Sequence, residues 1–109
     1  MNIEVSPKEY ERKLNWYDGM MYCQLLVIDG VDDWRMPTIE ELDYIYNSDK
    51  EVNDMYNSEN DFAVDCYWSS LDDGNLAWLH DMWGRGRKYM NKKTTRVYVR
   101  AVRSIKYEY

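Results

Sequence analysis

DWRMPTIEEL, residues 33–42, contains the most complete helix start in the chain. Thr38 and Glu41 have the spacing of a capping box, in which each side chain accepts a hydrogen bond from the other residue's backbone N–H. Pro37 fixes the backbone geometry just before the cap. The stretch therefore predicts a helix that begins after Pro37 and ends around residues 47–48. Its inward face consists of Ile39, Leu42, Ile45 and Tyr46.

An earlier helix is predicted from Ser6-Pro7-Lys8-Glu9, which combines a good N-cap residue, a proline suited to a first turn and a glutamate at the capping-box position. Large apolar residues then recur at spacings of three or four. They are Tyr10, Leu14, Tyr17, Met21 and Leu25. We expect this stripe to face the core and the helix to end near residues 29–30, with Gly30 as its C-cap. Gly19 inside it costs about 1 kcal/mol relative to alanine, which indicates either close packing or a weakened helix.

The second half of the chain is typical of β-strands. Strands are predicted around residues 66–69, at 76–83 and at 96–103, with a turn at 84–86. Residues 49–61 are rich in Asp, Asn, Ser and Glu, which predicts a surface loop. Helices followed by antiparallel strands predict one α+β domain over residues 1–109.

Composition limits the classes of function. The chain has 109 residues, which suits one domain, and a hydrophobic fraction of 45% predicts a folded core. A net charge of −6 disfavours nucleic acids and anionic membranes, because both carry negative phosphates. No stretch has the length and hydrophobicity of a membrane span, and the first residues lack a signal-peptide pattern. We therefore expect a protein of the cytoplasm, or of a virion assembled there.

Four blocks of the sequence resemble the DUF1566 or Lcl C-terminal domain family. Residues 33–42 resemble its DWRLPTxxEL signature, 16–23 the helix that precedes it, 67–70 its YWSS block and 98–103 its YVRAVR block. The family is similar to the C-type-lectin-like and sulfatase-modifying-factor-like folds. The resemblance implies two helices packed on a strongly twisted antiparallel sheet, long loops that display a ligand site, and a role in recognition.

The signature residues also have a structural explanation. They are Trp34, Arg35, Pro37, Thr38, Glu41, Trp68, Ser69, Arg100 and Arg103. Trp34 is a large hydrophobic anchor, and the Thr38 cap contributes about 1 kcal/mol. We expect the three arginines to pair with acidic groups such as Glu41 or Asp33, which would hold the helix on the terminal strand. The signature therefore predicts the scaffold rather than the ligand.

Groups suited to catalysis are few. His80 is the only histidine, and in a predicted strand we expect it to be a packed or surface residue rather than a base. Cys23 and Cys66 have no base beside them in sequence, so we expect reduced, buried thiols. With His80 they supply too few ligands for a Cys/His zinc site. We therefore expect no catalytic residue and no enzyme. The alternative is a degenerate modifying enzyme that uses either thiol with a metal.

Calcium is the ligand that the resemblance suggests, because many C-type lectins bind it through carboxylate and amide oxygens. Asp72, Asp73 and Asn75 supply such oxygens in a predicted loop. The same residues are ordinary turn formers, and the Glu-Pro-Asn and Trp-Asn-Asp motifs of lectins do not occur. We therefore expect no cofactor and no metal, with Ca²⁺ at this loop as the alternative.

Cations alternate with aromatic residues between residues 83 and 93, on a predicted hairpin connection, and this composition is typical of interface hot spots. The alternative is a solvated loop that balances neighbouring acids. We predict a partner-binding surface composed of Asp72, Asp73, Asn75, Trp83, Arg85, Arg87 and Tyr89.

The predicted function is a non-enzymatic recognition module for a protein or other macromolecular partner, such as a phage-encoded factor that blocks a host defence protein. Alternatives are a virion or adhesin-type structural domain, which could be a homo-oligomer, and a glycan-binding domain.

Overall fold

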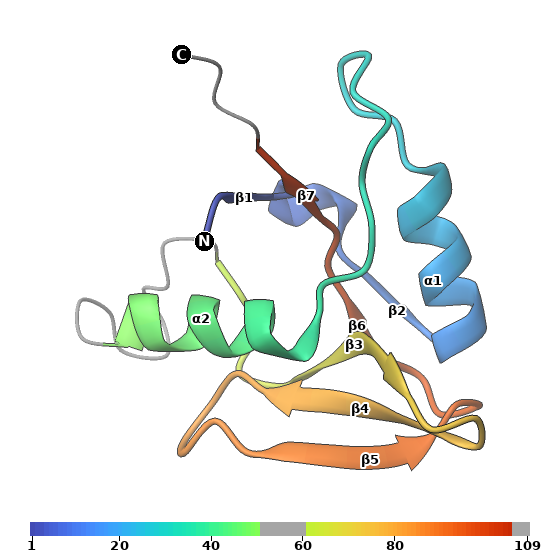
Figure 1. Ribbon diagram of the computed structural model, residues 1–109, viewed down its shortest axis with the longest axis vertical. Coiled ribbons are helices and arrows are strands. Elements are labelled where there is room, and N and C mark those ends of the chain that lie inside the picture. The colour runs from blue at the N-terminus through green and yellow to red at the C-terminus, as the bar shows by residue number, and fades with distance from the viewer. Residues whose placement is uncertain (51–60, 106–109) are drawn as a thin grey trace.

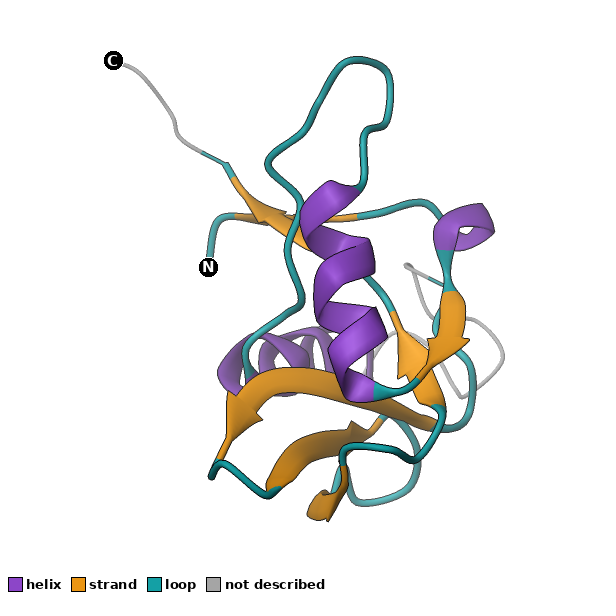
Figure 2. Cartoon of the chain, turned by 90° about the vertical axis from the view of Figure 1, so that its right-hand side faces the viewer, coloured by secondary structure: helices purple, strands orange, loops and turns teal. Residues whose placement is uncertain are grey.

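The computed structural model describes residues 1–50 and 61–105 and confirms the α+β class. Two α-helices, α1 (Trp16–Leu25) and α2 (Ile39–Lys50), lie above the strands that form the lower part of Figure 1. Turned by 90°, α1 is upright in front of α2, and the strands curve beneath both helices (Figure 2). The expected packing of helices on a sheet is therefore present, while the C-type-lectin-like fold itself stays a prediction.

The strands form a sheet of five and a separate pair. The order in the larger sheet is β2 (Arg12–Leu14), β6 (Val97–Val99), β3 (Cys66–Asp72), β4 (Leu76–Asp81) and β5 (Lys88–Lys92). Its pairings are antiparallel except between β3 and β6, which run parallel where Tyr67 is opposite Tyr98. The sheet is therefore mixed, not antiparallel throughout as expected. The pair consists of β1 (Ile3–Val5) and β7 (Val102–Ser104).

The predicted last strand, 96–103, is two strands in two different sheets. It breaks at Arg100 and Ala101, where the Ala101 carbonyl accepts a hydrogen bond from the Ser6 N–H at 2.9 Å and Arg100 Nε donates to the Ser6 carbonyl at 2.7 Å. β6 pairs with β2, whereas β7 pairs with β1. The break therefore moves the chain from one sheet to the other.

The first predicted helix is present as α1, but its predicted start at Ser6 was wrong. Residues 8–10 form a short 3-10 turn, residues 12–14 form β2, and α1 begins only after Asn15, whose side chain accepts a hydrogen bond from the Asp18 N–H at 2.9 Å. Tyr17, Met21 and Leu25 were expected in the core, but all three are exposed. The buried face of α1 consists instead of Trp16, Gly19 and Cys23. Pairing with β6 removed residues 12–14 from the predicted helix, and of the predicted apolar stripe only Tyr10 and Leu14 pack against the core.

Gly19 is in α1 because there is no space for a side chain. A Cβ there would lie 2.8 Å from Val99 and 2.9 Å from Met36, so the helix packs against β6 at the distance that only glycine allows. Gly30 is not the C-cap, because the helix ends at Leu25 and Gly30 lies in the turn between Ile28 and Val31. Close packing is therefore the reason for the glycine within the helix.

The second predicted helix is confirmed as α2, with Ile39, Leu42 and Ile45 buried. The predicted surface loop at 49–61 lies almost entirely outside the described residues.

Two buried clusters meet at β3. Trp68 belongs to the cluster that contains Trp16, Cys23 and Val99, whereas its neighbour Tyr67 packs with Leu42 and Ile45 of α2. Both side chains are fully buried. β3 is therefore buried on both faces, one covered by α2 and the other by the α1 cluster.

Candidate functional site

The signature at residues 33–42 joins α2 to β7. Glu41 N–H donates to Thr38 Oγ1 at 3.1 Å and Thr38 N–H donates to Glu41 Oε1 at 2.8 Å, which is the predicted capping box. Arg35 donates to both oxygens of the same carboxylate, at 2.6 and 2.7 Å, and to Ser104 Oγ at 2.9 Å. Burial alone would raise the pKa of Glu41, but hydrogen bonds from Arg35 and Thr38 bring it below its ordinary value. The predicted Arg35–Glu41 pair is confirmed.

The other two signature arginines hold the terminal strands. Arg103 Nε donates to Asp33 Oδ1 at 2.6 Å, as predicted, and its Nη1 donates to Glu4 Oε1 at 3.1 Å. Arg100 is buried and its acidic partner is Glu11, with Nη1 and Oε1 3.4 Å apart. These contacts tie β7 to Asp33 and Glu4, and the break between β6 and β7 to Glu11.

Trp68 and Ser69 connect β3 to the segments on either side. Trp68 Nε1 donates to the Leu14 carbonyl at 3.1 Å, Ser69 Oγ donates to the Trp78 carbonyl at 2.8 Å, and the Ser69 carbonyl accepts from Trp16 Nε1 at 2.9 Å. Both residues are fully buried. Like the arginines, they make internal contacts that maintain the scaffold.

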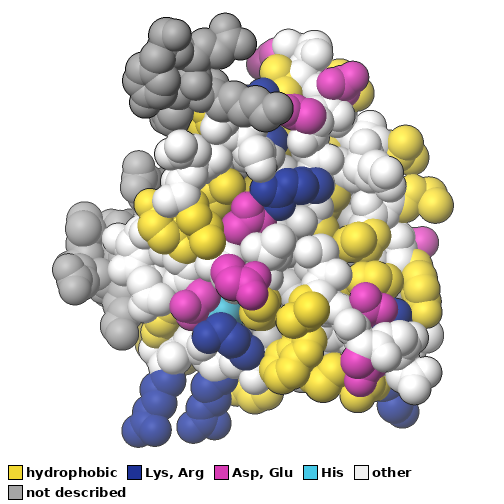
Figure 3. Space-filling model, in the orientation of Figure 1, with side chains coloured by type: hydrophobic (Ala, Val, Ile, Leu, Met, Phe, Trp, Pro, Cys, Tyr) yellow, Lys and Arg dark blue, Asp and Glu magenta, His cyan; other side chains and the backbone are white. Residues whose placement is uncertain are grey.

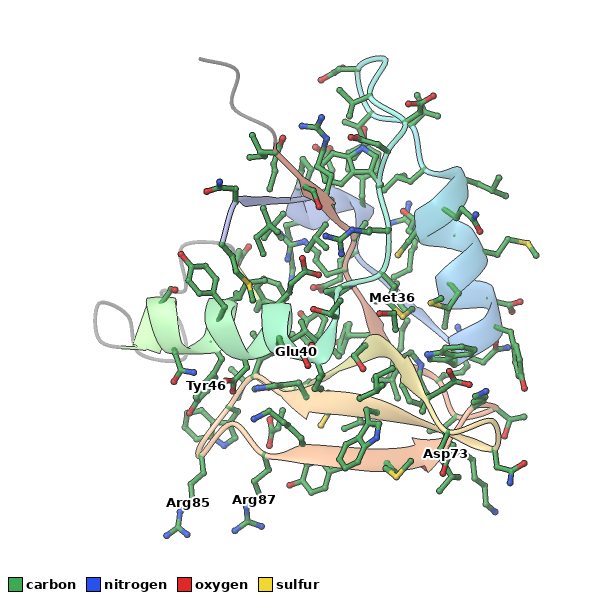
Figure 4. All side chains as sticks on the ribbon, viewed as in Figure 1. Met36, Glu40, Tyr46, Asp73, Arg85 and Arg87 are labelled. Carbon is green, nitrogen blue, oxygen red and sulfur yellow. The ribbon has the colours of Figure 1, made fainter. Side chains whose placement is uncertain are left out.

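The basic segment at 83–93 was predicted to be one hairpin connection. In the structure it is a loop at 83–87 followed by the edge strand β5. We call residues 83–87 the basic loop. Trp83, Arg85 and Arg87 are exposed in it. In Figure 4, Arg85 and Arg87 point in the same direction, away from the sheet. Neither takes part in an ion pair among the described residues. Lys and Arg side chains protrude at this corner of the space-filling view (Figure 3).

Tyr46 of α2 holds the basic loop in place. Its hydroxyl donates to the Gly84 carbonyl, and a Cβ on Gly86 would lie 2.6 Å from its ring. Gly84 and Gly86 have φ angles of 67° and 65°, in the region that favours glycine. Within the loop, Gly86 N–H donates to the Trp83 carbonyl at 3.2 Å. An aromatic ring from α2 therefore packs directly against the basic loop and supports it.

His80 forms a second connection between α2 and the hairpin. The prediction left open whether His80 is packed or at the surface; it is fully buried, with Nε2 3.2 Å from Asp43 Oδ1 and Nδ1 2.9 Å from the Asp81 carbonyl. Lys88 Nζ lies 3.1 Å from the same Asp43 oxygen. The hydrogen bond from His80, with the Lys88 charge, holds the pKa of Asp43 below its ordinary value. Sequence reasoning missed both Asp43 and Tyr46, which lie more than thirty residues before the loop that they support.

Asp72, Asp73 and Asn75 were predicted to form one surface with the basic loop. They do not, because they lie at the other end of β4. Six residues of strand separate the two ends by roughly 20 Å. Figure 4 shows Asp73 far from Arg85 and Arg87. The predicted binding surface is therefore two separate places, and only Trp83, Arg85, Arg87 and Tyr89 lie at the same end of the hairpin, in the basic loop or at the start of β5.

The carboxylates of the Asp72–Asn75 turn are already bound within the protein. Lys93 is buried, and its Nζ lies 2.6 Å from Asp72 Oδ2 and 3.1 Å from the Gly74 carbonyl, above the Trp16 ring at 4.4 Å. Asp73 Oδ1 accepts the backbone N–H of Asn75 and of Leu76, at 3.0 and 2.8 Å. The Lys93 ammonium group thus occupies the space beside Asp72 Oδ2 and the Gly74 carbonyl, two oxygens that a Ca²⁺ ion at this turn would use. With Lys93 in this position, the turn does not fit a cation at these two oxygens.

The thiols are poorly suited to nucleophilic chemistry. Burial raises the pKa of Cys23 to about 12, and burial together with the charges of Asp81 and Asp65 raises the pKa of Cys66 to about 11. Both cysteines are free, and Cys23 is buried as predicted, whereas Cys66 is partly exposed. Among residues 1–50 and 61–105, no three His, Cys, Asp or Glu side chains gather as metal ligands.

An open groove of about 440 Å³ extends from Tyr89 across the sheet. Leu79 and Cys66 line it, together with Asn91 and the cation Arg96. Tyr89 is opposite Leu79 in the β4–β5 pairing and is exposed. Tyr89, just after the basic loop, therefore lies at the edge of this groove.

Comparison with known families places the chain in one of them. The Lcl C-terminal domain family matches residues 4–103, nearly the whole chain, so the protein belongs to this family. A search of curated proteins gives no match. No helix among the described residues could cross a membrane, given the length and polarity of α1 and α2.

Proposed function

We propose that this Lcl C-terminal domain is a non-catalytic recognition module that binds an acidic surface of a protein partner through Trp83, Arg85, Arg87 and Tyr89. The observation that carries the proposal is the presentation of Arg85 and Arg87. Both are exposed, both lack an ion-pair partner among the described residues, and both project from a loop held by Tyr46.

A braced loop loses little conformational entropy on binding. Ordering a mobile side chain or loop costs about 0.5–1.5 kcal/mol for each immobilised rotamer-rich side chain, and a preorganised surface avoids part of that cost. Here the loop backbone is already fixed by the Gly86 N–H bond and by Tyr46. More of the contact energy is therefore available as affinity.

The residue types suit a protein surface. Arginine binds carboxylates through two parallel N–H bonds, and Trp, Tyr and Arg are the residues enriched at interface hot spots. Because the protein has a net charge of −6, a small cationic surface favours one orientation of approach to an acidic partner. The partner face should therefore carry paired Asp or Glu residues near an apolar site for Trp83.

The thiol and histidine chemistry supports a non-catalytic role. A nucleophilic cysteine needs a lowered pKa, whereas the pKa of Cys66 is raised to about 11. His80 is fully buried between Asp43 and the Asp81 carbonyl. One form of the proposed role is a small phage-encoded cytoplasmic factor that blocks a host defence protein by occupying its surface.

The experiment is capture of partners from the native host on immobilised protein, followed by affinity measurement with the captured partner. Arg85→Glu combined with Arg87→Glu should weaken binding about 100-fold or more, because attraction becomes repulsion at two positions. Two single variants form a matched pair as a control. Arg85→Glu and Lys92→Glu change the net charge equally, but Lys92 lies at the far end of β5 from the basic loop. A folded double variant with unchanged binding would refute the proposal.

A further inference from the structure

The exposed face of α1 and the residues just after it carry several large apolar side chains. Tyr17, Met21, Leu25 and Val27 are 56%, 61%, 71% and 58% exposed. Asp18 is the only charged residue in α1. Hydrophobic side chains protrude on the side of Figure 3 where α1 lies. Several large apolar side chains exposed together mark an interaction surface more often than isolated ones do.

This face has a ridge beside a groove. Tyr17, Met21 and Leu25 are spaced by four residues and form one ridge along the helix. Asp18, Tyr22 and Leu26 form the next ridge, at the same spacing. The shallow apolar groove between the two ridges is lined by residues of both ridges and by Val27. One face therefore carries both shapes that helix packing requires.

We propose that the α1 face binds the α1 face of a second copy of this chain in a symmetric dimer. In a two-fold contact the same surface meets itself, so the surface must be self-complementary. Here the ridge of each copy enters the groove of the other, which is the packing of two i, i+4 ridges at a crossing angle of about 50°. Met21, in the middle of the ridge, then lies close to the two-fold axis and meets Met21 of the other copy.

Charge favours a second copy at this face over other faces. Two chains that each carry −6 repel one another, so the contact must form where charge is low. With Met21 at the axis and the helices running in opposite directions, Asp18 of one copy lies toward Gln24 of the other. A neutral amide can donate to that carboxylate, and no two like charges meet.

The area predicts a weak dimer. The four exposed side chains present roughly 400 Å² in each copy, if a fully exposed large side chain presents about 150–200 Å². Two such faces bury about 800 Å², below the 1,200–2,000 Å² of stable interfaces, which places the dimer among weak, transient complexes. We therefore expect an association that depends on concentration.

Sedimentation equilibrium of the full chain tests the dimer. The weight-average mass should rise from the 13.3 kDa of one chain toward twice that value as concentration increases over about 10 µM to 1 mM. Met21→Glu should weaken association at least tenfold, because two carboxylates then meet near the axis. Tyr44→Glu, an exposed aromatic on α2, should leave association unchanged. A wild-type chain that stays monomeric over this range, or a dimer that persists in folded Met21→Glu, would overturn the proposal.

A cross-link provides the second readout. Met21→Cys should form a disulfide-linked dimer that a reductant reverses, whereas Tyr44→Cys should not exceed the wild-type background from Cys66. Dimers linked equally well through both positions would also overturn the proposal. Partner binding by the basic loop is independent of this face: Met21→Glu should bind the captured partner normally, and the Arg85→Glu and Arg87→Glu variant should still dimerise.

Discussion

The two ends of the β4–β5 hairpin both carry charged residues, but they use them differently. At the turn end, Asp72 binds Lys93 and Asp73 binds backbone N–H groups. At the loop end, Asp43 and Lys88 form an ion pair at the surface, while Arg85 and Arg87 are exposed without an ion-pair partner among the described residues. A charged side chain is available to a binding partner only when the fold gives it no oppositely charged group within the protein. This difference distinguishes a structural turn from a candidate binding loop.

The largest expected effect is at the loop end. In Gly86→Ala the new Cβ would lie 2.6 Å from the Tyr46 ring, at a φ of 65°. We expect a loss of about 2–3 kcal/mol in the free energy of unfolding. Gly84→Ala is the matched control, because its φ is 67° but no atom lies within 4 Å, so only about 1 kcal/mol should be lost. Urea unfolding measures both, and equal losses would show that Tyr46 does not brace the loop.

Lys93→Met breaks the turn end. It removes the ion pair with Asp72 and the contact with the Trp16 ring, while the Asp72 carboxylate stays exposed to water. We expect a loss of about 1 kcal/mol in the free energy of unfolding, because a half-screened ion pair and a buried cation–ring contact are both lost. Lys92→Met, at an exposed neighbour without an ion pair among the described residues, should stay within about 0.5 kcal/mol of wild type. If both variants unfold alike, Lys93 is not the internal cation of this turn.

Acid should weaken the loop end through Asp43. Its pKa is lowered in the folded protein, first by the hydrogen bond from His80 and also by Lys88, so the folded state binds fewer protons than the unfolded state. The resulting stabilisation is present above the ordinary carboxyl pKa of about 4 and is lost as the pH falls through the lowered value. Because Asp43 is partly exposed, we expect about 0.5 kcal/mol after screening.

The corresponding measurement is the thermal midpoint between pH 6 and pH 3. Asp43→Asn should lower the midpoint at pH 6 by a few degrees, about 2–4 °C, and the two curves should converge in acid. Curves that stay parallel over the whole range would contradict the assigned role of Asp43.

The smallest expected effect concerns Cys66, which is opposite Asp81 beside the loop end. If this thiol were a nucleophile, the loop end would be an active site rather than a binding surface. Because burial and two nearby carboxylates raise the pKa of Cys66 to about 11, alkylation at pH 8 should be much slower than that of free cysteine. Cys23 should react only on unfolding. Fast labelling of Cys66 in the folded protein, together with bound metal, would favour the enzyme alternative.

Local signals predicted part of the fold. The box formed by Thr38 and Glu41 acts within four residues, so α2 could be located from sequence. Ser6 offered an equally good local start for the first helix, but pairing of residues 12–14 with β6, more than eighty residues away, outweighed it. The strand β5 was missed because its residues, Lys88–Lys92, are mostly polar and lie at a sheet edge. Long-range pairing is not visible in local spacing.

The candidate site was predictable only in composition. The arginines of the basic loop were found because cations and aromatics cluster there, but the same pattern included Lys93, which turns inward to Asp72. Tyr46 was assigned to the inward face of α2, and its contact with Gly84 required the tertiary structure. Which charges are exposed follows from the fold and not from their order in the chain.

The most direct test compares the partner affinity of a variant at each end of the hairpin. The captured partner should bind the combined Arg85→Glu and Arg87→Glu variant about 100-fold more weakly than wild type, a loss of about 2.7 kcal/mol in binding free energy. Asn75→Lys, at the turn end, should bind within a factor of about two, because Asn75 is exposed and lies at the other end of β4. The reverse pattern, with affinity lost in Asn75→Lys and kept in the folded loop variant, would contradict the assignment of binding to the basic loop.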